Sequence, residues 1–417
     1  MRKSKTVPKL NTIREAIDAI AAGEFVVVVD DEDRENEGDL IIAAESVTDE
    51  GMAFMVKYTS GVVCCPITNE RADALHLPLM VANNTEAMGT AFTVSVDVAE
   101  GTTTGISASD RALTCNALAN DQVAASGFAR PGHVFPLRAR PGGVLKRAGH
   151  TEAAVDLATM AGLSPAGVIS EIVSDDGTMA RLPELLKFSK RHDIPIISIA
   201  DMIRYRNRHE RLVERFSIAR IPTRYGEFEA RIYRSSLDEV EHLALVSSNF
   251  DPDEAPLVRV HSECLTGDVL GSLRCDCGPQ LDLATQLIAQ NGNGAVIYLR
   301  GHEGRGIGLG HKMRAYALQD EGLDTVEANE ALGFPPDSRE YGIGAQIIAD
   351  LGIQKMRLLT NNPAKYGGLE GYNLQIIERV PLISGENPEN LRYLQTKGER
   401  LGHLLLEDKI NENEEKL

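Results

Sequence analysis

Three cysteines in the second half of the chain have the spacing of a metal site. Cys275 and Cys277 form a Cys-x-Cys pair, and Cys264 precedes them as a third thiol. Three thiolates can bind one zinc ion and leave a fourth position open for water, as catalytic zinc sites do. A closed structural site needs four protein ligands, usually from paired Cys-x-x-Cys knuckles, and those knuckles are missing here. The spacing therefore indicates zinc, and a structural site with His261 as its fourth ligand stays open.

An acidic segment in the first half is a second candidate metal site. Residues 30–39 contain seven carboxylates and directly follow an apolar run that is typical of a strand. Because crowded carboxylates repel one another, such a cluster usually has a cation to offset the repulsion. An EF-hand does not fit, since Gly38 lies too far along and no Glu closes the loop. Hard oxygen ligands favour Mg²⁺ or Mn²⁺, and the alternative is a solvated acidic turn.

Two further segments place a histidine among glycine and arginine. They are residues 130–133 (Arg-Pro-Gly-His) and 147–151 (Arg-Ala-Gly-His-Thr). Glycine lets the backbone approach a ligand closely, and arginine and threonine can hold a phosphate. A third segment, residues 303–310, is glycine-rich but matches neither a Walker A motif nor a G-x-G-x-x-G fingerprint. Its glycines are equally consistent with a turn before a helix that starts near His311.

The first half resembles the family of 3,4-dihydroxy-2-butanone 4-phosphate synthase. The resemblance rests on residues 30–39, 102–106, 130–137, 147–151 and 165–171. It implies conversion of ribulose 5-phosphate to the four-carbon product and formate, with Mg²⁺ or Mn²⁺ held by Glu35 and His150. It also implies that His133 and Glu171 transfer protons. The substrate contacts that it implies are Arg34, Glu35, Asp39, Arg147, Ala148, Gly149, His150, Thr151 and Glu171.

The second half resembles GTP cyclohydrolase II, through residues 259–281, 303–305, 324–329 and 358–363. This resemblance implies that Cys264, Cys275 and Cys277 bind zinc. It places Tyr316 near the zinc-bound water, Asp337 as proton acceptor and Arg339 as nucleophile on the α-phosphate. Because guanidinium is a poor nucleophile, a phosphate clamp is an equal alternative for Arg339. The implied GTP contacts are Arg259, Val260, His261, Ser262, Glu263, Gln280, Glu303, Gly304, Arg305, Thr325, Thr360 and Lys365.

The chemistry of the two reactions fits these residue types. Rearrangement of a ketose needs enolisation, which a divalent cation and groups that move protons both assist. Zinc lowers the pKa of bound water toward about 7, which would permit attack on guanine C8. Magnesium on the triphosphate would favour departure of pyrophosphate. Together the halves resemble a bifunctional enzyme of riboflavin biosynthesis.

Composition limits the partners. The 417 residues include 43 Lys and Arg against 61 Asp and Glu, a net charge of −18. This balance argues against nucleic acid and anionic membranes, because affinity for phosphate needs clustered cations. The first ten residues are basic, but no apolar segment of signal-peptide length follows, and no run approaches the roughly 18 apolar residues of a membrane helix. We expect a cytoplasmic enzyme of small substrates, and the resemblance implies a homodimer.

The elements that position these residues indicate two α/β domains with mixed sheets, of the α+β kind. Thr12 and Glu15 fit a capping box before a helix at 13–20, Gly23 ends it, and residues 25–29 form a strand. Other expected strands are 92–98, 194–199 and 295–299, and other expected helices are 182–191, 281–289 and 312–319. Residues 204–215 are charge-dense and predict a solvated helix or linker, and the end from 407 predicts fraying. The domains are therefore predicted as residues 1–205 and 206–417, unrelated to each other.

Two alternatives remain. In one, the same folds are kept and one half is catalytically silent, retained for assembly. In the other, a zinc-ribbon binding module is fused to a metal-buffering acidic domain. The second alternative predicts a fourth zinc thiolate and a basic face, and neither is evident in the sequence.

Overall fold

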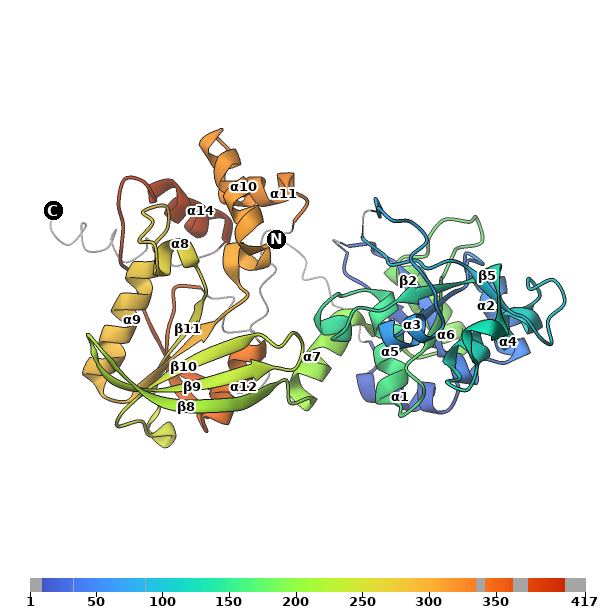
Figure 1. Ribbon diagram of the computed structural model, residues 1–417, viewed down its shortest axis with the longest axis horizontal. Coiled ribbons are helices and arrows are strands. Elements are labelled where there is room, and N and C mark those ends of the chain that lie inside the picture. Colours follow the sequence, from blue (N-terminus) through green and yellow to red (C-terminus); the bar gives the residue numbers. More distant parts are fainter. Residues whose placement is uncertain (1–9, 33, 87, 335–341, 363–373, 402–417) are drawn as a thin grey trace. The chain divides into compact units, whose positions relative to one another are not determined.

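The computed structural model describes residues 10–32, 34–86, 88–334, 342–362 and 374–401. The chain divides into two compact units, Met1–His209 and Glu210–Leu417 (Figure 1). Each unit contains one seven-stranded sheet with helices packed on it. No helix in the described part of the chain is both long and apolar enough to cross a membrane.

The sheet of the first unit has the strand order β4-β5-β3-β6-β2-β1-β7. Strand β1 is parallel to β7 and β3 to β5, whereas β2 is antiparallel to both β1 and β6. The strands are β1 (Val26–Val29), β2 (Gly38–Ala43), β3 (Cys64–Ile67), β4 (Val96–Val98), β5 (Phe128–Arg138), β6 (Gly167–Glu171) and β7 (Ile196–Ser198). The helices are α1 (Ile13–Ala21), α2 (Asp49–Tyr58), α3 (Asn69–Ala74), α4 (Ala108–Ala119), α5 (His150–Met160), α6 (Leu182–His192) and α7 (Ile199–His209).

The first unit buries both faces of its sheet, which explains the β-branched run at its start. Val27 and Val29 join one apolar core, and Val26 and Val28 join the other, because successive side chains of a strand point to opposite faces. Helix α1 packs on the second core and begins with the predicted capping box of Thr12 and Glu15. A strand that is buried on both faces can present functional groups only at its ends, and the candidate site lies there.

The second unit combines an antiparallel and a parallel half in the order β14-β13-β11-β12-β10-β9-β8. Strands β8, β9, β10 and β12 are antiparallel neighbours, and β12, β11, β13 and β14 are parallel. The strands are β8 (Val213–Thr223), β9 (Gly226–Ser235), β10 (Glu241–Ser247), β11 (Leu257–Ser262), β12 (Gly294–Leu299), β13 (Lys355–Leu359) and β14 (Gln375–Val380). The helices are α8 (Leu265–Asp268), α9 (Cys277–Asn291), α10 (Gly308–Asp320), α11 (Thr325–Ala331), α12 (Gly342–Asp350) and α14 (Leu391–Leu401).

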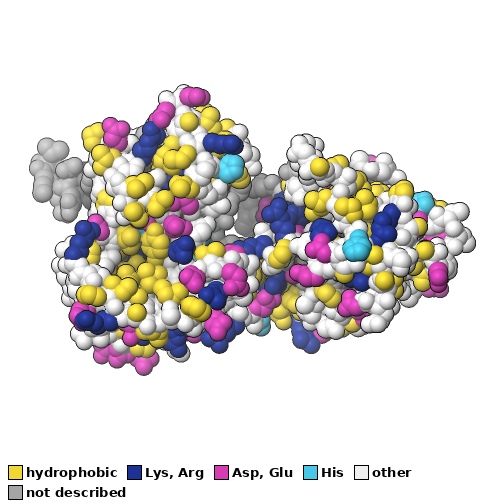
Figure 2. Space-filling model, viewed as in Figure 1, with side chains coloured by type: hydrophobic (Ala, Val, Ile, Leu, Met, Phe, Trp, Pro, Cys, Tyr) yellow, Lys and Arg dark blue, Asp and Glu magenta, His cyan; other side chains and the backbone are white. Residues whose placement is uncertain are grey.

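The predicted fold class of two domains with mixed sheets is confirmed, and one local prediction needs correction. The alternating segment 92–98 is strand only over Val96–Val98, because Phe92 makes no more than an isolated bridge to Leu137. The charged segment 204–215, predicted as a solvated helix or linker, is helix as far as His209, where α7 ends, and becomes strand at Val213, where β8 begins. The segment expected to fray, from residue 407, lies outside the described residues. Figure 2 shows basic and acidic side chains interspersed over the visible face of each unit.

Candidate active sites

Asp30 organises the acidic loop of the first unit from the end of β1. Its carboxylate accepts hydrogen bonds from the backbone N–H groups of Glu35 at 3.0 Å and Glu37 at 2.9 Å. It also accepts one from Arg34 Nη1 at 2.9 Å, and Arg34 in turn contacts Glu35 at 2.5 Å. The loop is therefore folded around its first carboxylate, which leaves the Glu35 side chain at the centre of the site.

His150 enters this site from the first turn of α5. Its Nε2 lies 3.1 Å from the carbonyl oxygen of Val28, and a carbonyl can only accept, so Nε2 carries a proton. The other ring nitrogen, Nδ1, then faces Glu35 at 3.6 Å and Asp39 at 3.7 Å. A histidine that binds a metal usually donates its second N–H to a carbonyl in this way. Potential ligand atoms of Asp30, Glu35 and His150 all lie within 4.8 Å of one another.

The electrostatics of this cluster show an excess of buried negative charge. Burial alone would lower the pKa of His150, but attraction by Asp39 and Glu35 raises it to about 9. Burial raises the pKa of Asp39 to about 7, and contact with His150 lowers that of Glu35 to about 2. The Oδ1 atom of Asp39 is buried and has no hydrogen-bond partner. Carboxylate oxygens, one imidazole and an unsatisfied acceptor together fit a hard divalent cation.

Glu171 lies at the end of β6, beside this cluster. The strand register pairs it directly with Asp39 of β2, so the two side chains lie on the same face of the sheet. Ser60 Oγ donates to Glu171 Oε2 at 2.7 Å. Glu171 is thus oriented by a hydroxyl and stands next to the predicted metal ligands.

Arg147, Gly149 and Thr151 lie around the amino-terminal end of α5. Arg147 forms an ion pair with the buried Glu152 at 2.8 Å and donates to Thr90 Oγ1 at 2.9 Å. A Cβ atom on Gly149 would lie 2.5 Å from Arg147 Nη1, so a larger residue there would displace the guanidinium. Thr151 is in the first turn of the helix, where N–H groups and the helix dipole favour anions. This corner can hold a phosphate, as the sequence predicts for these residues and for Ala148 between them.

His133 is oriented, but the described contacts do not bring it to the metal cluster. Asp97 binds it twice, at 2.7 Å from Oδ2 to Nδ1 and at 2.8 Å from Oδ1 to the backbone N–H. Strand β3 separates β5, which carries His133, from β6, which carries Glu171. At about 4.8 Å between neighbouring strands, these two strands lie about 10 Å apart. His133 and Glu171 can face the same small substrate without contacting each other.

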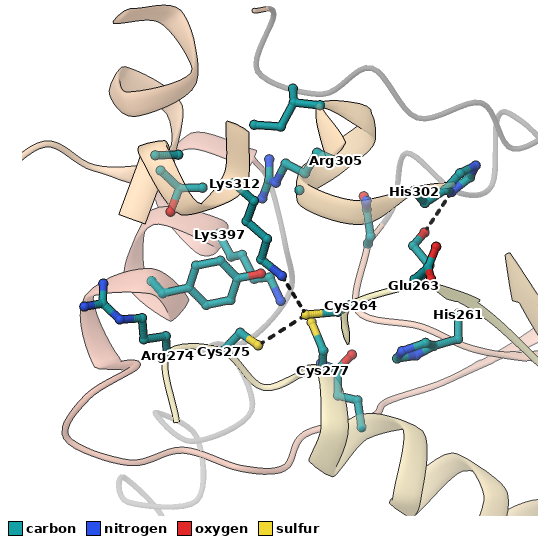
Figure 3. Close-up of a pocket in the computed structure, with 18 of the residues that line it drawn as sticks. His261, Glu263, Cys264, Arg274, Cys275, Cys277, His302, Arg305, Lys312 and Lys397 are labelled. Atoms are coloured by element: carbon teal, nitrogen blue, oxygen red, sulfur yellow. Dashed lines mark hydrogen bonds between the residues drawn. The ribbon is translucent and has the colours of Figure 1, made fainter. Parts of the chain in front are cut away.

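In the second unit, the three predicted cysteines come together at the start of α9. Cys264 Sγ and Cys275 Sγ are 3.7 Å apart, and the three sulfurs all lie within 4.8 Å of one another (Figure 3). Tetrahedral zinc with bonds of about 2.3 Å needs sulfurs about 3.8 Å apart, so this spacing fits zinc. A Cβ atom on Gly267 would lie 2.8 Å from Cys275 Sγ, so the thiols close around a glycine. Among the described residues, the cluster includes no fourth Cys, His, Asp or Glu.

His261, the alternative fourth ligand, is turned to other partners. Its Nε2 lies 3.0 Å from Asp268 Oδ1, and its Nδ1 lies 3.5 Å from Arg259 Nη2. Asp268 also accepts a hydrogen bond from the backbone N–H of Cys264 at 3.0 Å. His261 therefore contacts Asp268, which in turn binds the backbone of Cys264. This arrangement favours a site with three thiolates and an open fourth position over a site in which His261 is the fourth ligand.

A buried lysine, which the sequence did not predict as a site residue, places its positive charge against the thiol of Cys264. Lys312 Nζ of α10 lies 3.2 Å from Cys264 Sγ and 2.9 Å from Thr266 Oγ1, and it forms an ion pair with Glu303. Hydrogen bonds from the neighbouring thiols and the charge of Lys312 lower the pKa of Cys264 well below its usual range. Tyr316 Oη lies 3.3 Å from Thr266 Oγ1, next to this group. One positive side chain thus faces the thiolates and the predicted tyrosine.

The cysteines open into a pocket whose empty volume, open solvent included, is about 1070 Å³. Predicted residues that line it are Arg259, His261, Ser262, Glu263, Gln280, Gly304, Arg305, Tyr316, Thr325 and Thr360, besides the three cysteines. Val260 is buried in β11. Glu303 forms an ion pair with Lys312 and accepts a hydrogen bond from the backbone N–H of Leu265 at 2.6 Å.

Comparison with known proteins places both units in one family. The family model of 3,4-dihydroxy-2-butanone 4-phosphate synthase matches residues 14–205, and that of GTP cyclohydrolase II matches residues 214–381. The riboflavin biosynthesis protein RibBA of Nocardia farcinica is 62% identical over 95% of this chain and 97% of its own. The chain belongs to the bifunctional riboflavin biosynthesis family.

Two further relatives match the chain across both units. The probable bifunctional riboflavin biosynthesis protein RIBA 2, chloroplastic, of Oryza sativa is 60% identical over 94% of this chain and 72% of its own. The crystal structure of RibBX from A. baumannii, a two-domain 3,4-dihydroxy-2-butanone 4-phosphate synthase, has 39% identity and a TM-score of 0.69. That match covers 89% of this chain and 99% of RibBX. The chain is thus an enzyme with a synthase domain and a cyclohydrolase domain.

Some functional residues of this family member lie beyond the sequence predictions or beyond the described residues. Asp337, Arg339 and Lys365 fall on residues that the structure does not describe. Pocket-lining residues that sequence reasoning missed include Arg274, Lys312, Asn329, Asn361, Tyr393 and Lys397. Arg274, Asn329 and Asn361 lie within the segments that carry the resemblance, whereas Lys312, Tyr393 and Lys397 lie outside them and share no local pattern. Asp30 did have a signal, because it is the first carboxylate after a buried strand.

Proposed function

We propose that this enzyme makes both precursors of riboflavin. In residues 1–205 it converts ribulose 5-phosphate to 3,4-dihydroxy-2-butanone 4-phosphate and formate. In residues 206–417 it hydrolyses GTP to 2,5-diamino-6-ribosylamino-4(3H)-pyrimidinone 5′-phosphate, formate and pyrophosphate. The observation that supports this proposal is the presence of two different groups of potential metal ligands. One unit has two carboxylates and an imidazole, which suit a hard cation, and the other has three thiols, which suit a softer one.

In the synthase domain, Glu35 and His150 would hold Mg²⁺ or Mn²⁺, with Asp30 fixing the loop. The cation would supply stabilisation of charge that develops on adjacent substrate oxygens during enolisation. Arg34, Arg147 and Thr151, with the backbone at Ala148 and Gly149, bind the sugar phosphate. Asp39 and Glu171 lie on the same face of the sheet, where Glu171 exchanges protons with the substrate. His133, oriented by Asp97, serves as the second proton-transfer group.

In the cyclohydrolase domain, Cys264, Cys275 and Cys277 would hold zinc. Zinc would supply a Lewis acid that brings the pKa of water toward about 7 for attack on guanine C8. Tyr316 orients the reacting water, and Asp337 accepts a proton. Arg339 contacts the α-phosphate, as nucleophile or as clamp, and Mg²⁺ accompanies the triphosphate. GTP is held by Arg259, Val260, His261, Ser262, Glu263, Gln280, Glu303, Gly304, Arg305, Thr325, Thr360 and Lys365.

The cellular setting is part of the proposal. We propose that the enzyme works in the cytoplasm as a homodimer on small phosphate-bearing substrates, without nucleic acid or membrane partners. The support is the net charge of −18 and the resemblance itself. Size-exclusion chromatography with light scattering tests the dimer, and a mass of one chain at assay concentration contradicts it.

Formate release from each substrate separately tests the two activities. The purified chain should release formate from ribulose 5-phosphate with Mg²⁺ and from GTP with zinc bound. Formate from one substrate only would instead support the alternative in which one half is silent. The zinc-ribbon alternative is set aside, because the chain belongs to an enzyme family and the described cluster has three thiols.

A further inference from the structure

Helix α14 contributes to the cyclohydrolase pocket although it lies beyond the matched family model. The match ends at residue 381, and α14 spans Leu391–Leu401. Tyr393 and Lys397, four residues apart on one face of the helix, both line the pocket, and Figure 3 labels Lys397. Lys397 is buried, and its Nζ lies 4.5 Å from the centre of the Tyr393 ring. A buried lysine is unfavourable unless it is paired, so its partner shows what it does.

That partner is Asp276, which lies between two of the zinc cysteines. Lys397 Nζ is 2.6 Å from Asp276 Oδ1, and both side chains are buried. Asp276 is also the residue that precedes α9, directly between Cys275 and Cys277. The ion pair therefore ties the last described helix of the chain to the turn that carries the cysteines.

Asp276 is connected by hydrogen bonds to Gln280 and Arg259, two predicted GTP contacts. Its Oδ2 accepts from Gln280 Nε2 at 2.6 Å, and Gln280 Oε1 accepts from Arg259 Nη2 at 2.8 Å. A carboxylate only accepts and a guanidinium only donates, so the orientation of the Gln280 amide is fixed by its two neighbours. Arg259 Nη1 donates in addition to the carbonyl of Leu359 at 3.1 Å. The chain of contacts runs from Lys397 through Asp276 and Gln280 to Arg259.

We propose that Lys397 is a positioning residue of the cyclohydrolase site, which holds Gln280 and Arg259, through Asp276, in the orientation that binds GTP. This inference rests on the proposed GTP cyclohydrolase function. Without the ammonium group, Asp276 would be a buried carboxylate lacking its cation, and its side chain would rotate toward another partner and release Gln280. The consequence falls on GTP binding more than on the chemical step, because the residues at the far end of the network are substrate contacts.

Replacement of the lysine by methionine tests the inference in the full-length enzyme. The variants are Lys397→Met, the double variant Lys397→Met with Asp276→Asn, and Gln395→Met, an exposed position on the same helix. We would measure kcat and KM for formate release from GTP, zinc content, and formate release from ribulose 5-phosphate as a folding control. If Lys397→Met does not fold, Lys397→Gln replaces it under the same criteria.

For Lys397→Met, KM for GTP should rise about tenfold or more with a smaller fall in kcat, since a charged hydrogen bond is lost. Zinc content and ribulose 5-phosphate activity should stay at the wild-type level. The double variant should recover most of the loss, because asparagine accepts from Gln280 without a buried charge. Gln395→Met should match wild type.

For Lys397→Met, a KM within twofold of wild type or a loss of zinc would overturn the inference, as would no recovery in the double variant. A wild-type enzyme inactive on GTP would instead overturn the proposed function.

Discussion

The two candidate sites handle buried charge in opposite ways. The synthase site collects Asp30, Glu35 and Asp39 around one histidine, and Asp39 keeps a buried oxygen without a hydrogen-bond partner. The cyclohydrolase site places Lys312 against its thiols and Lys397 against Asp276. In the first site Arg34 and His150 face these carboxylates, and a bound divalent cation would offset the remaining negative charge. In the second site, Lys312 and Lys397 already balance negative charge on Cys264 and Asp276.

A chain of net charge −18 needs local positive groups to bind the two proposed phosphate substrates. In the synthase site a bound cation and the amino-terminal end of α5 would attract the phosphate, and in the cyclohydrolase site the pocket arginines Arg259, Arg274 and Arg305 would do so. The synthase site should therefore depend on exchangeable metal, and the cyclohydrolase site should keep its metal and depend on its lysines.

The largest expected effect comes from removing one thiol. Cys275→Ser should lower formate release from GTP by about 1000-fold, because loss of a Lewis acid costs several kcal/mol of transition-state stabilisation. Formate release from ribulose 5-phosphate, measured in the same preparation, should not change. Loss of both activities in a protein that remains folded would show that the two sites are not independent.

The corresponding change in the other site is His150→Ala. Formate release from ribulose 5-phosphate should fall by about 100-fold to 1000-fold, since a metal ligand and its charge are both lost. Formate release from GTP should stay at the wild-type level. His209→Ala, which removes an exposed histidine of the same unit, is the matched control and should keep both activities.

Dialysis against EDTA compares the metals directly. Carboxylate sites exchange Mg²⁺ readily, whereas three thiolates bind zinc tightly. After EDTA is removed, ribulose 5-phosphate activity should be lost and return with added Mg²⁺, and about one zinc per chain should remain by atomic emission. If zinc leaves as readily as magnesium, the contrast between the sites is wrong.

Lys312→Met tests whether protein charge supports the thiolates. GTP activity should fall by about 10-fold to 100-fold, a typical cost of losing a group that supports the metal ligands, while zinc stays bound. Lys355→Met, which removes an exposed lysine of the same unit, should leave the kinetics of GTP hydrolysis unchanged. Equal activity in both variants would argue against a role for Lys312.

The smallest expected effect is on stability alone. Thr12→Ala removes the capping box of α1 and should cost about 1 kcal/mol in the free energy of unfolding. Urea unfolding measures it, and both activities per folded enzyme should remain unchanged. A change in ribulose 5-phosphate kinetics would mean that α1 affects the site as well as the fold.

Local sequence patterns predicted much of this architecture. The capping box of Thr12, the valine run at 26–29 and the helix of residues 281–289 depend on neighbours in sequence, and all three are confirmed. The strand expected at 92–98 is confined to Val96–Val98, because Phe92 makes only an isolated bridge to β5. Alternation of apolar residues predicts a strand but cannot show how long a partner continues beside it.

The sequence by itself determined which residues can do chemistry: the three thiols, the acidic loop, and the arginine and histidine segments. Tertiary structure alone decided which of these meet and what compensates their charge. Lys312 and Lys397 come from helices far along the chain, and only the folded structure brings them to Cys264 and Asp276. The physical reason is that a buried charge needs a partner in space, and distance along the chain does not restrict where that partner comes from.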